Sequence, residues 1–224
     1  MNIIKQVGKS SLIIIGVIAL MQQLAMGQHR QRKRADAGKE SATESAQLRS
    51  FIKQAEGAGI EFSFPSVLKE VPPVNNENFS FDYAMAMPGY AFEVWLQVHS
   101  LKQNWASYEQ VKNITGKMMA NPDSTYINTI KAQAIALSDD SRYTIRSLAP
   151  ELLEVYNTDA GKSCMISLAD LPETKGYKYA LLIALQKDHV GYFLAVCLTN
   201  DKGPDFFRNI KKVRECIKFR PGRG

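Results

Sequence analysis

The stretch YKYALLIALQKDHVGYFLAVCLT, residues 177–199, decides the fold of this 224-residue chain. It consists of two apolar runs on either side of the short polar segment Lys187-Asp188-His189-Val190. Apolar runs of this length without clean alternation are typical of central strands covered on both faces. The polar segment predicts the loop of a hairpin. We therefore expect two adjacent strands at the centre of a sheet.

The sequence on either side of this hairpin adds further elements. SCMISLAD, residues 163–170, has the same apolar character and predicts another covered strand. Gly203-Pro204 opens a helix, and ECIKF, residues 215–219, predicts a short final strand. The helix is expected to place four apolar side chains inward: Phe206, Phe207, Ile210 and Val213.

A second hairpin is predicted upstream, where apolar side chains alternate with period two on either side of Pro88-Gly89. The expected inward faces are Phe81, Tyr83, Met85 and Met87 on one strand and Phe92, Val94, Leu96 and Val98 on the other. The opposite face of the second strand carries Glu93, Trp95, Gln97 and His99. This pattern predicts half-buried strands. We interpret the four methionines Met85, Met87, Met118 and Met119 as core-filling residues.

Helical patterns fill the region between the two hairpins. Ser107 and Gln110 match a capping box, followed by the stripe Tyr108, Val111, Ile114 and Met118. A stronger stripe follows Pro122, at Ile127, Ile130, Ala134 and Leu137, and Pro150 suits the first turn of a short third helix. Together these elements predict an α+β fold, an antiparallel β-sheet with helices packed against it.

This order of elements resembles the PsbP-like fold, and within it small exported proteins of Bacteroidetes type that have no known function. The segments that carry the resemblance are IEFSFP at the start of the body, the two hairpins and the closing DFFRNIKKVRECIKF. It covers about residues 58–221 and includes no catalytic motif. The resemblance implies a fold and an exported location, and it transfers no site residue to this chain.

The N-terminus has the pattern of a secretory signal peptide over residues 1–27. Lys5 and Lys9 precede the ten-residue apolar run LIIIGVIALM, and Ala25-Met26-Gly27 supplies small residues for cleavage. We therefore expect an exported protein, periplasmic or secreted. The alternative is an inner-membrane anchor through residues 10–27, because the basic residues that follow the cleavage site hinder export.

Composition divides the remainder of the chain into three segments. Residues 28–57 are predicted to be a basic, polar tether with a short helix at 46–55, residues 58–221 a single α+β domain, and residues 222–224 a tail. Acidic residues outnumber basic ones by 18 to 14 between residues 45 and 207, whereas the C-terminal end is strongly basic. The basic side chains there that are candidates for an anion-attracting surface are Arg208, Lys211, Lys212, Arg214, Lys218 and Arg220. The alternative is an ordinary solvated face.

No sequence motif indicates a catalytic, cofactor or metal site. The chain lacks P-loop, dinucleotide-binding, nucleophile-elbow and zinc-protease signatures, and Gly161-Lys162-Ser163 lacks the earlier glycine that a P-loop requires. The three cysteines, Cys164, Cys197 and Cys216, are interpreted as buried thiols. A Cys197–Cys216 disulfide is the alternative, because an exported location permits one.

These observations favour an exported, non-enzymatic module that binds a protein or a cell-envelope component, with weak contact to an anionic surface. A hydrolase-type enzyme, whose residues come together only in three dimensions, is the alternative. Nucleic-acid binding is disfavoured, because the basic residues sit on one short helix and a tail without groove-reading elements. No cofactor is expected.

Overall fold

A computed structural model describes residues 44–112, 114, 120–138 and 142–221. The predicted signal peptide, the tether up to residue 43, Met118, Met119 and the tail at 222–224 lie outside the described residues. The chain divides into two units, Met1–Ser45 and Ala46–Gly224. The second unit contains every element described below.

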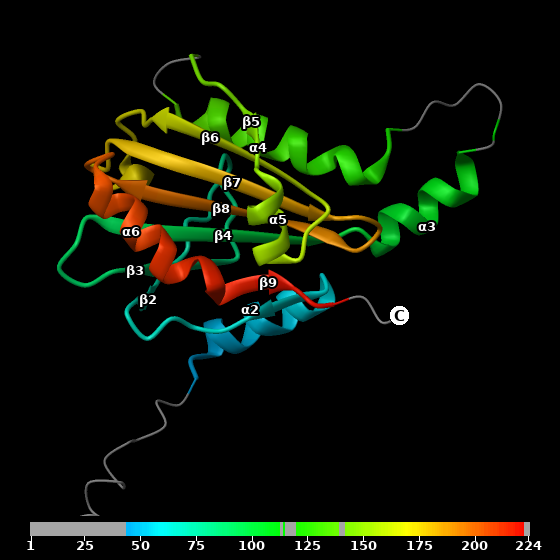
Figure 1. Cartoon of the computed structure of the whole chain (residues 1–224), viewed down its shortest axis with the longest axis horizontal. Coiled ribbons are helices and arrows are strands. Elements are labelled where there is room, and N and C mark those ends of the chain that lie inside the picture. Colours follow the sequence, from blue (N-terminus) through cyan, green and yellow to red (C-terminus); the bar gives the residue numbers. More distant parts are fainter. Residues whose placement is uncertain (1–43, 113, 115–119, 139–141, 222–224) are drawn as a thin grey trace, which may run out of the picture. The chain divides into compact units, whose positions relative to one another are not determined.

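The fold is α+β, as predicted, and is built on an antiparallel seven-stranded sheet (Figure 1). In chain order its strands are β2 (Lys69–Val71), β3 (Tyr83–Ala86), β4 (Phe92–Ser100), β5 (Arg146–Ser147), β6 (Ala160–Ser167), β7 (Tyr179–Lys187) and β8 (Gly191–Thr199). Their spatial order is β2-β3-β4-β8-β7-β6-β5. A separate two-stranded sheet pairs β1 (Ile60–Phe62) with β9 (Ile217–Phe219), so both ends of the body meet there.

The described helices lie between and beside these strands. They are α2 (Ala46–Gly57), α3 (Lys102–Val111), α4 (Thr125–Leu137), α5 (Pro150–Tyr156) and α6 (Pro204–Val213), with short 3₁₀ turns η1 (Pro122–Ser124), η2 (Pro172–Thr174) and η3 (Arg214–Cys216). The predicted short helix at 46–55 and the helices after Pro122, Pro150 and Gly203 are confirmed. Among the described residues, no helix is both long enough and apolar enough to cross a membrane.

Strands β4 and β8 pair along their whole length and form the centre of the sheet. Nine consecutive residue pairs join them, from Phe92 opposite Thr199 to Ser100 opposite Gly191. All nine residues of β8 are buried, which confirms a strand covered on both faces. Strand β7 also pairs with β8 through nine residues, and the predicted loop at 188–190 joins them.

The two faces of the sheet are covered by different elements. On one face α4 buries Ile130, Ala134 and Leu137 against β6, β7 and β8. On the other face lie α2, α5, α6 and the β1–β9 pair. On this second face β6 and β7 expose half-buried side chains, so the prediction of complete cover is wrong for these two strands.

The predicted polar face of β4 is also wrong. Trp95 is fully buried and Glu93 is 4% exposed, because the segment that leads into β3 covers this side of β4 with Phe79 and Phe81. Gln97 and His99, nearer the end of the strand, remain half-buried. Phe81 packs with Trp95 on this side, at a ring-centroid distance of 5.0 Å. It therefore faces the other side of the sheet from Tyr83, although the two were predicted to share a face.

The first helix after β4 begins earlier than predicted. It starts at Lys102, five residues before the expected capping serine Ser107. The reason is that the backbone N–H of Leu101 bonds to the Val190 carbonyl, which extends the β4–β8 contact until the chain turns directly into α3. Ile114, expected in a buried stripe, is 49% exposed.

Helix α6 corrects one further prediction. Phe206 and Val213 are buried, Ile210 is half-buried, and Phe207, expected inward, is 46% exposed. Neighbouring positions on a helix point about 100° apart, so only one of two adjacent phenylalanines faces the sheet directly. Phe206 takes that position and packs on Phe92, with ring centroids 6.0 Å apart.

The adjacent phenylalanines of α6 give a direct test of this placement. Phe206→Ala should lower the free energy of unfolding by about 3–5 kcal/mol, because a buried aromatic side chain is lost. Phe207→Ala should lower it by no more than about 1 kcal/mol, because nearly half of the residue is already exposed to water. Urea denaturation of the two variants measures both values. Equal losses would contradict the described orientation of α6.

Candidate functional site

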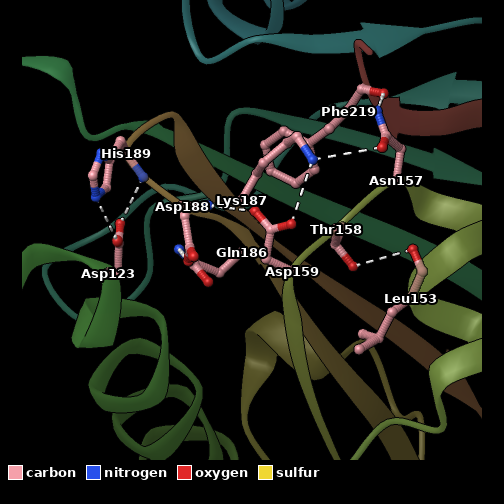
Figure 2. Close-up of polar contacts among 10 residues, drawn as sticks. All are labelled: Asp123, Leu153, Asn157, Thr158, Asp159, Gln186, Lys187, Asp188, His189 and Phe219. Atoms are coloured by element: carbon pink, nitrogen blue, oxygen red, sulfur yellow. Dashed lines mark hydrogen bonds and ion pairs between the residues drawn. The ribbon is translucent and has the colours of Figure 1, made fainter. Parts of the chain in front are cut away.

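Polar side chains from distant parts of the chain gather around the turn between β7 and β8 (Figure 2). His189 adopts a left-handed backbone conformation there, with φ of 62°. Its backbone N–H donates to Asp123 Oδ1 at 3.0 Å, and Trp105 Nε1 donates to the same oxygen at 2.9 Å. The His189 ring lies on the Trp105 ring, with centroids 3.9 Å apart. Asp123 therefore connects the turn to α3 and η1.

A second carboxylate anchors the other side of the same turn. Asp159 Oδ2 accepts the backbone N–H of Asp188 at 2.8 Å, and Asp159 Oδ1 lies 3.6 Å from Lys187 Nζ. Lys187 Nζ also lies 3.5 Å from Asn157 Oδ1. Asn157 in turn donates to the Phe219 carbonyl at 3.1 Å, which joins the turn to β9 (Figure 2).

These contacts favour a role for the cluster in holding the turn. An Asp–His pair can act in acid–base catalysis when the imidazole reaches a nucleophile or a substrate. Here His189 Nε2 lies 3.8 Å from Asp123 Oδ2, beyond hydrogen-bond distance, and the side chain is 67% exposed. No serine or cysteine of the described residues hydrogen-bonds to His189 in this cluster.

A buried carboxylate lies on β4, near the end of the strand away from that turn. Glu93 Oε1 accepts from Trp95 Nε1 at 2.6 Å and from Lys175 Nζ at 2.6 Å. Lys175 ends the η2 turn with a positive φ of 53°. From this position its amine reaches the Glu93 carboxylate on β4. Lys175 is 82 residues from Glu93 in the sequence, and no motif connects the two. The pair could therefore not be predicted from the sequence. The carboxylate is buried and the lysine side chain is 41% exposed, so the pair suits a half-buried ion pair that fixes η2.

His99, the histidine that shares a strand face with Glu93, does not join it. Its ring stacks on Tyr192 at a centroid distance of 4.7 Å. Burial lowers the pKa of His99, and the Asp82 carboxylate opposes this effect in part. The side chain is a half-buried part of the sheet.

The six predicted anion-attracting residues are spread over α6, η3, β9 and the segment after it. Four of them lie against a carboxylate: Arg208 against Asp205, Arg214 against Glu215, Lys218 against Glu61 and Arg220 against Glu56. Lys211 and Lys212 have no carboxylate partner among the described residues. Uncompensated positive charge is therefore greatest on the last turn of α6.

Two exposed aromatic residues accompany those lysines, a feature that the sequence prediction missed. Tyr90, in the turn between β3 and β4, is 61% exposed, and Lys212 Nζ lies 5.8 Å from its ring centroid. Phe207 is one helical turn before Lys211 and is also exposed. We call Tyr90, Phe207, Arg208, Lys211 and Lys212 the α6 surface.

The described residues also contain an internal cavity of about 30 Å³ and a surface hollow of about 280 Å³. The cavity lies between the sheet and α5, α6 and η3, and its lining is apolar apart from Arg214, Tyr156 and the two thiols Cys197 and Cys216. The hollow lies between α3 and α4 and presents amide, hydroxyl and small side chains: Gln103, Asn104, Ser107, Ala120, Pro122 and Thr125. Among the described residues, neither lining contains a carboxylate or a histidine.

Comparisons with known proteins give the chain no family. No protein-family model matches the chain, and a comparison with curated proteins finds no match. Within the described ranges, His, Cys, Asp and Glu side chains form no group of three or more that could hold a metal ion.

All three cysteines are free thiols in the structure, although Cys197 and Cys216 line the same cavity. Burial raises the pKa of Cys164 to about 11 and those of Cys197 and Cys216 to about 12. Because the thiolate is the reactive form, these cysteines should react slowly with a thiol reagent in the native protein.

Thiol counting tests this assignment. The native protein at about pH 8 should show little rapid reaction with Ellman's reagent, because the thiols are buried and protonated. The same protein in concentrated guanidinium chloride should release the colour of three thiols per chain. A single thiol in the denatured chain would show that two of the three cysteines are joined, and would contradict the free-thiol assignment.

Proposed function

We propose that this protein is an exported, non-enzymatic binding module that attaches to the cell envelope through the α6 surface. The observation that carries the proposal is the combination of Tyr90 and Phe207, both exposed, with Lys211 and Lys212, which lack carboxylate partners in the described part of the chain. The signal-peptide pattern and the basic tether predicted from the sequence supply the location.

The chemistry of the α6 surface suits the interface of an anionic phospholipid membrane. Tyrosine and phenylalanine rings enter the headgroup region, while lysine side chains keep their amines at the anionic surface. Each lysine or arginine near such a surface contributes about 1 kcal/mol of attraction. Exposed ion pairs such as Arg208 with Asp205 are weak, so Arg208 can exchange its partner for a lipid phosphate.

The side chains that line the internal cavity and the α3–α4 hollow favour binding over catalysis. Acid–base or nucleophilic catalysis needs titratable groups that converge on a shared space. The α3–α4 hollow presents amide, hydroxyl and small side chains, and the carboxylates at the β7–β8 turn accept backbone N–H groups. The internal cavity contains the Cys197 and Cys216 thiols, but burial raises the pKa of both to about 12, so they stay protonated and poorly nucleophilic.

We also propose that the body has a PsbP-like fold. Support comes from the order of its elements, with an N-terminal β1 strand, two hairpins and a closing helix that leads into β9. A fold of this kind is compatible with several functions, so this part of the proposal does not select a ligand.

Vesicle co-sedimentation tests the membrane proposal. The full chain should bind vesicles that contain phosphatidylglycerol, should bind pure phosphatidylcholine vesicles much less, and should dissociate as salt screens the charges. Replacing Arg208, Lys211 and Lys212 by glutamine should weaken binding by at least about tenfold, since three attractive charges are lost. The melting temperature should change little, because these side chains are exposed.

A charge-matched variant provides the control. Lys53, Lys102 and Lys131 are exposed lysines on α2, α3 and α4, and replacing them by glutamine removes the same charge elsewhere. This variant should keep most of the vesicle binding. Equal losses in the two triple variants would refute the α6 surface as the contact. Retention on an anionic polysaccharide without any vesicle binding would refute the choice of a membrane.

A further inference from the structure

Two contacts between a lysine and a tyrosine ring lie next to α6. Lys212 Nζ is 5.8 Å from the centroid of the Tyr90 ring, in the turn between β3 and β4. Lys202 Nζ is 4.1 Å from the centroid of the Tyr179 ring, at the start of β7. These are the cation–π contacts of the described residues. Tyr90 and Lys212 belong to the α6 surface, whereas Tyr179 and Lys202 lie outside it.

The Tyr179–Lys202 contact is on the face of the sheet that carries α6. Alternation along β7 directs Tyr179 to this face, because Ala180 is buried under α4 on the other face. Tyr179 pairs with Thr199 on β8, and Thr199 pairs with Phe92 on β4. Phe206 of α6 packs on Phe92. The first turn of α6 therefore lies over the same row of residues as Tyr179.

The two contacts lie on opposite flanks of α6. Phe207 and Arg214 share one flank, because seven residues make about two turns of a helix. This flank faces β7, since Arg214 lines the internal cavity together with Ile183. Lys212 is about 140° around the helix from Phe207 and reaches Tyr90 on the side of β3 and β4. Each flank of α6 therefore carries an aromatic ring with a lysine over it.

Lys202 carries a positive charge that no described carboxylate neutralises. The ion pairs found within the described ranges do not include it. Its neighbour Asp201 accepts a backbone N–H at 3.0 Å, and Asp205 pairs with Arg208. Five basic and two acidic residues lie between positions 200 and 214. The charge of this region therefore attracts an anionic partner.

The tyrosine ring also orients Lys202 for an anion. A cation–π contact holds the ammonium group over the face of the ring. It uses none of the three ammonium N–H groups in a conventional hydrogen bond, so these donors remain for a phosphate oxygen. Because the side chain is already held in place, it has less conformational entropy to lose on binding.

We infer that Tyr179 and Lys202 form a second contact with the phosphate groups of an anionic phospholipid membrane, on the opposite flank of α6 from Tyr90 and Lys212. Lys202 binds the phosphate, and the exposed edge of the half-buried Tyr179 lies in the headgroup region. The inference rests on the proposed function and extends its contact from the helix to the sheet.

Vesicle co-sedimentation of full-chain variants tests this second contact. Lys202→Gln should weaken binding to phosphatidylglycerol vesicles by about fivefold, which is the attraction of one basic residue near an anionic surface. Tyr179→Leu should weaken binding by about twofold, because the ring that orients the lysine is lost. Tyr179→Phe should bind as the wild type does, because the ring is kept.

Lys178 provides the matched control. It is an exposed lysine next to Tyr179 in the sequence, and alternation directs its side chain to the α4 face. Lys178→Gln should therefore bind within about twofold of the wild type. A direct readout is NMR of the full chain with ¹³C-dimethylated lysines, which keep their charge. Nanodiscs that contain phosphatidylglycerol should shift the signal of Lys202 and leave that of Lys178 in place.

Three results would overturn the inference. They are absence of vesicle binding by the wild type, equal losses in Lys202→Gln and Lys178→Gln, and wild-type binding by Lys202→Gln. If the triple glutamine variant of the α6 surface still loses binding in the last case, the proposed function stands without the second contact. Loss in Lys202→Gln with none in that triple variant would refute the α6 surface and keep Tyr179 and Lys202 as the contact.

Discussion

The pairing of β4 with β8 is the interaction on which the rest of the structure depends. It joins two hairpins that are about a hundred residues apart in the sequence through nine consecutive residue pairs. Because β8 is buried on both faces, this pairing requires a covering layer on each side of the sheet. Helix α4 supplies one layer, and α2, α5, α6 and the β1–β9 pair supply the other.

The two layers differ in how completely they cover the sheet. Helix α4 closes its face over β6 and β7, whereas α5 and α6 leave Met165, Leu181 and Ile183 half-buried between them. The carboxylates of Asp123 and Asp159 accept backbone N–H groups of the β7–β8 turn and so hold it in place.

Local sequence patterns were sufficient to predict the longer strands, most helices and the α+β class, but not the short strands β2 and β5. Period-two alternation predicted the inward face of β4, and the helical stripe at Ile130 and Ala134 predicted the buried face of α4. The errors concern features set by long-range contacts. The cover over Trp95, the outward turn of Phe207 and the ion pair of Glu93 with Lys175 depend on which elements meet in space. The α6 surface was half predicted, since its lysines were evident and the exposure of its aromatic rings was not.

Solvent accessibility of methyl groups in the folded protein tests this asymmetry most directly. A soluble paramagnetic gadolinium chelate broadens NMR signals of methyl groups that water can approach. The methyl signals of Leu181 and Ile183 should broaden strongly, and those of Leu182 and Leu194, on the face closed by α4, should not. Equal protection of the two sets would show that both faces are closed to the same degree, and would contradict the less complete cover of the face that carries α5 and α6.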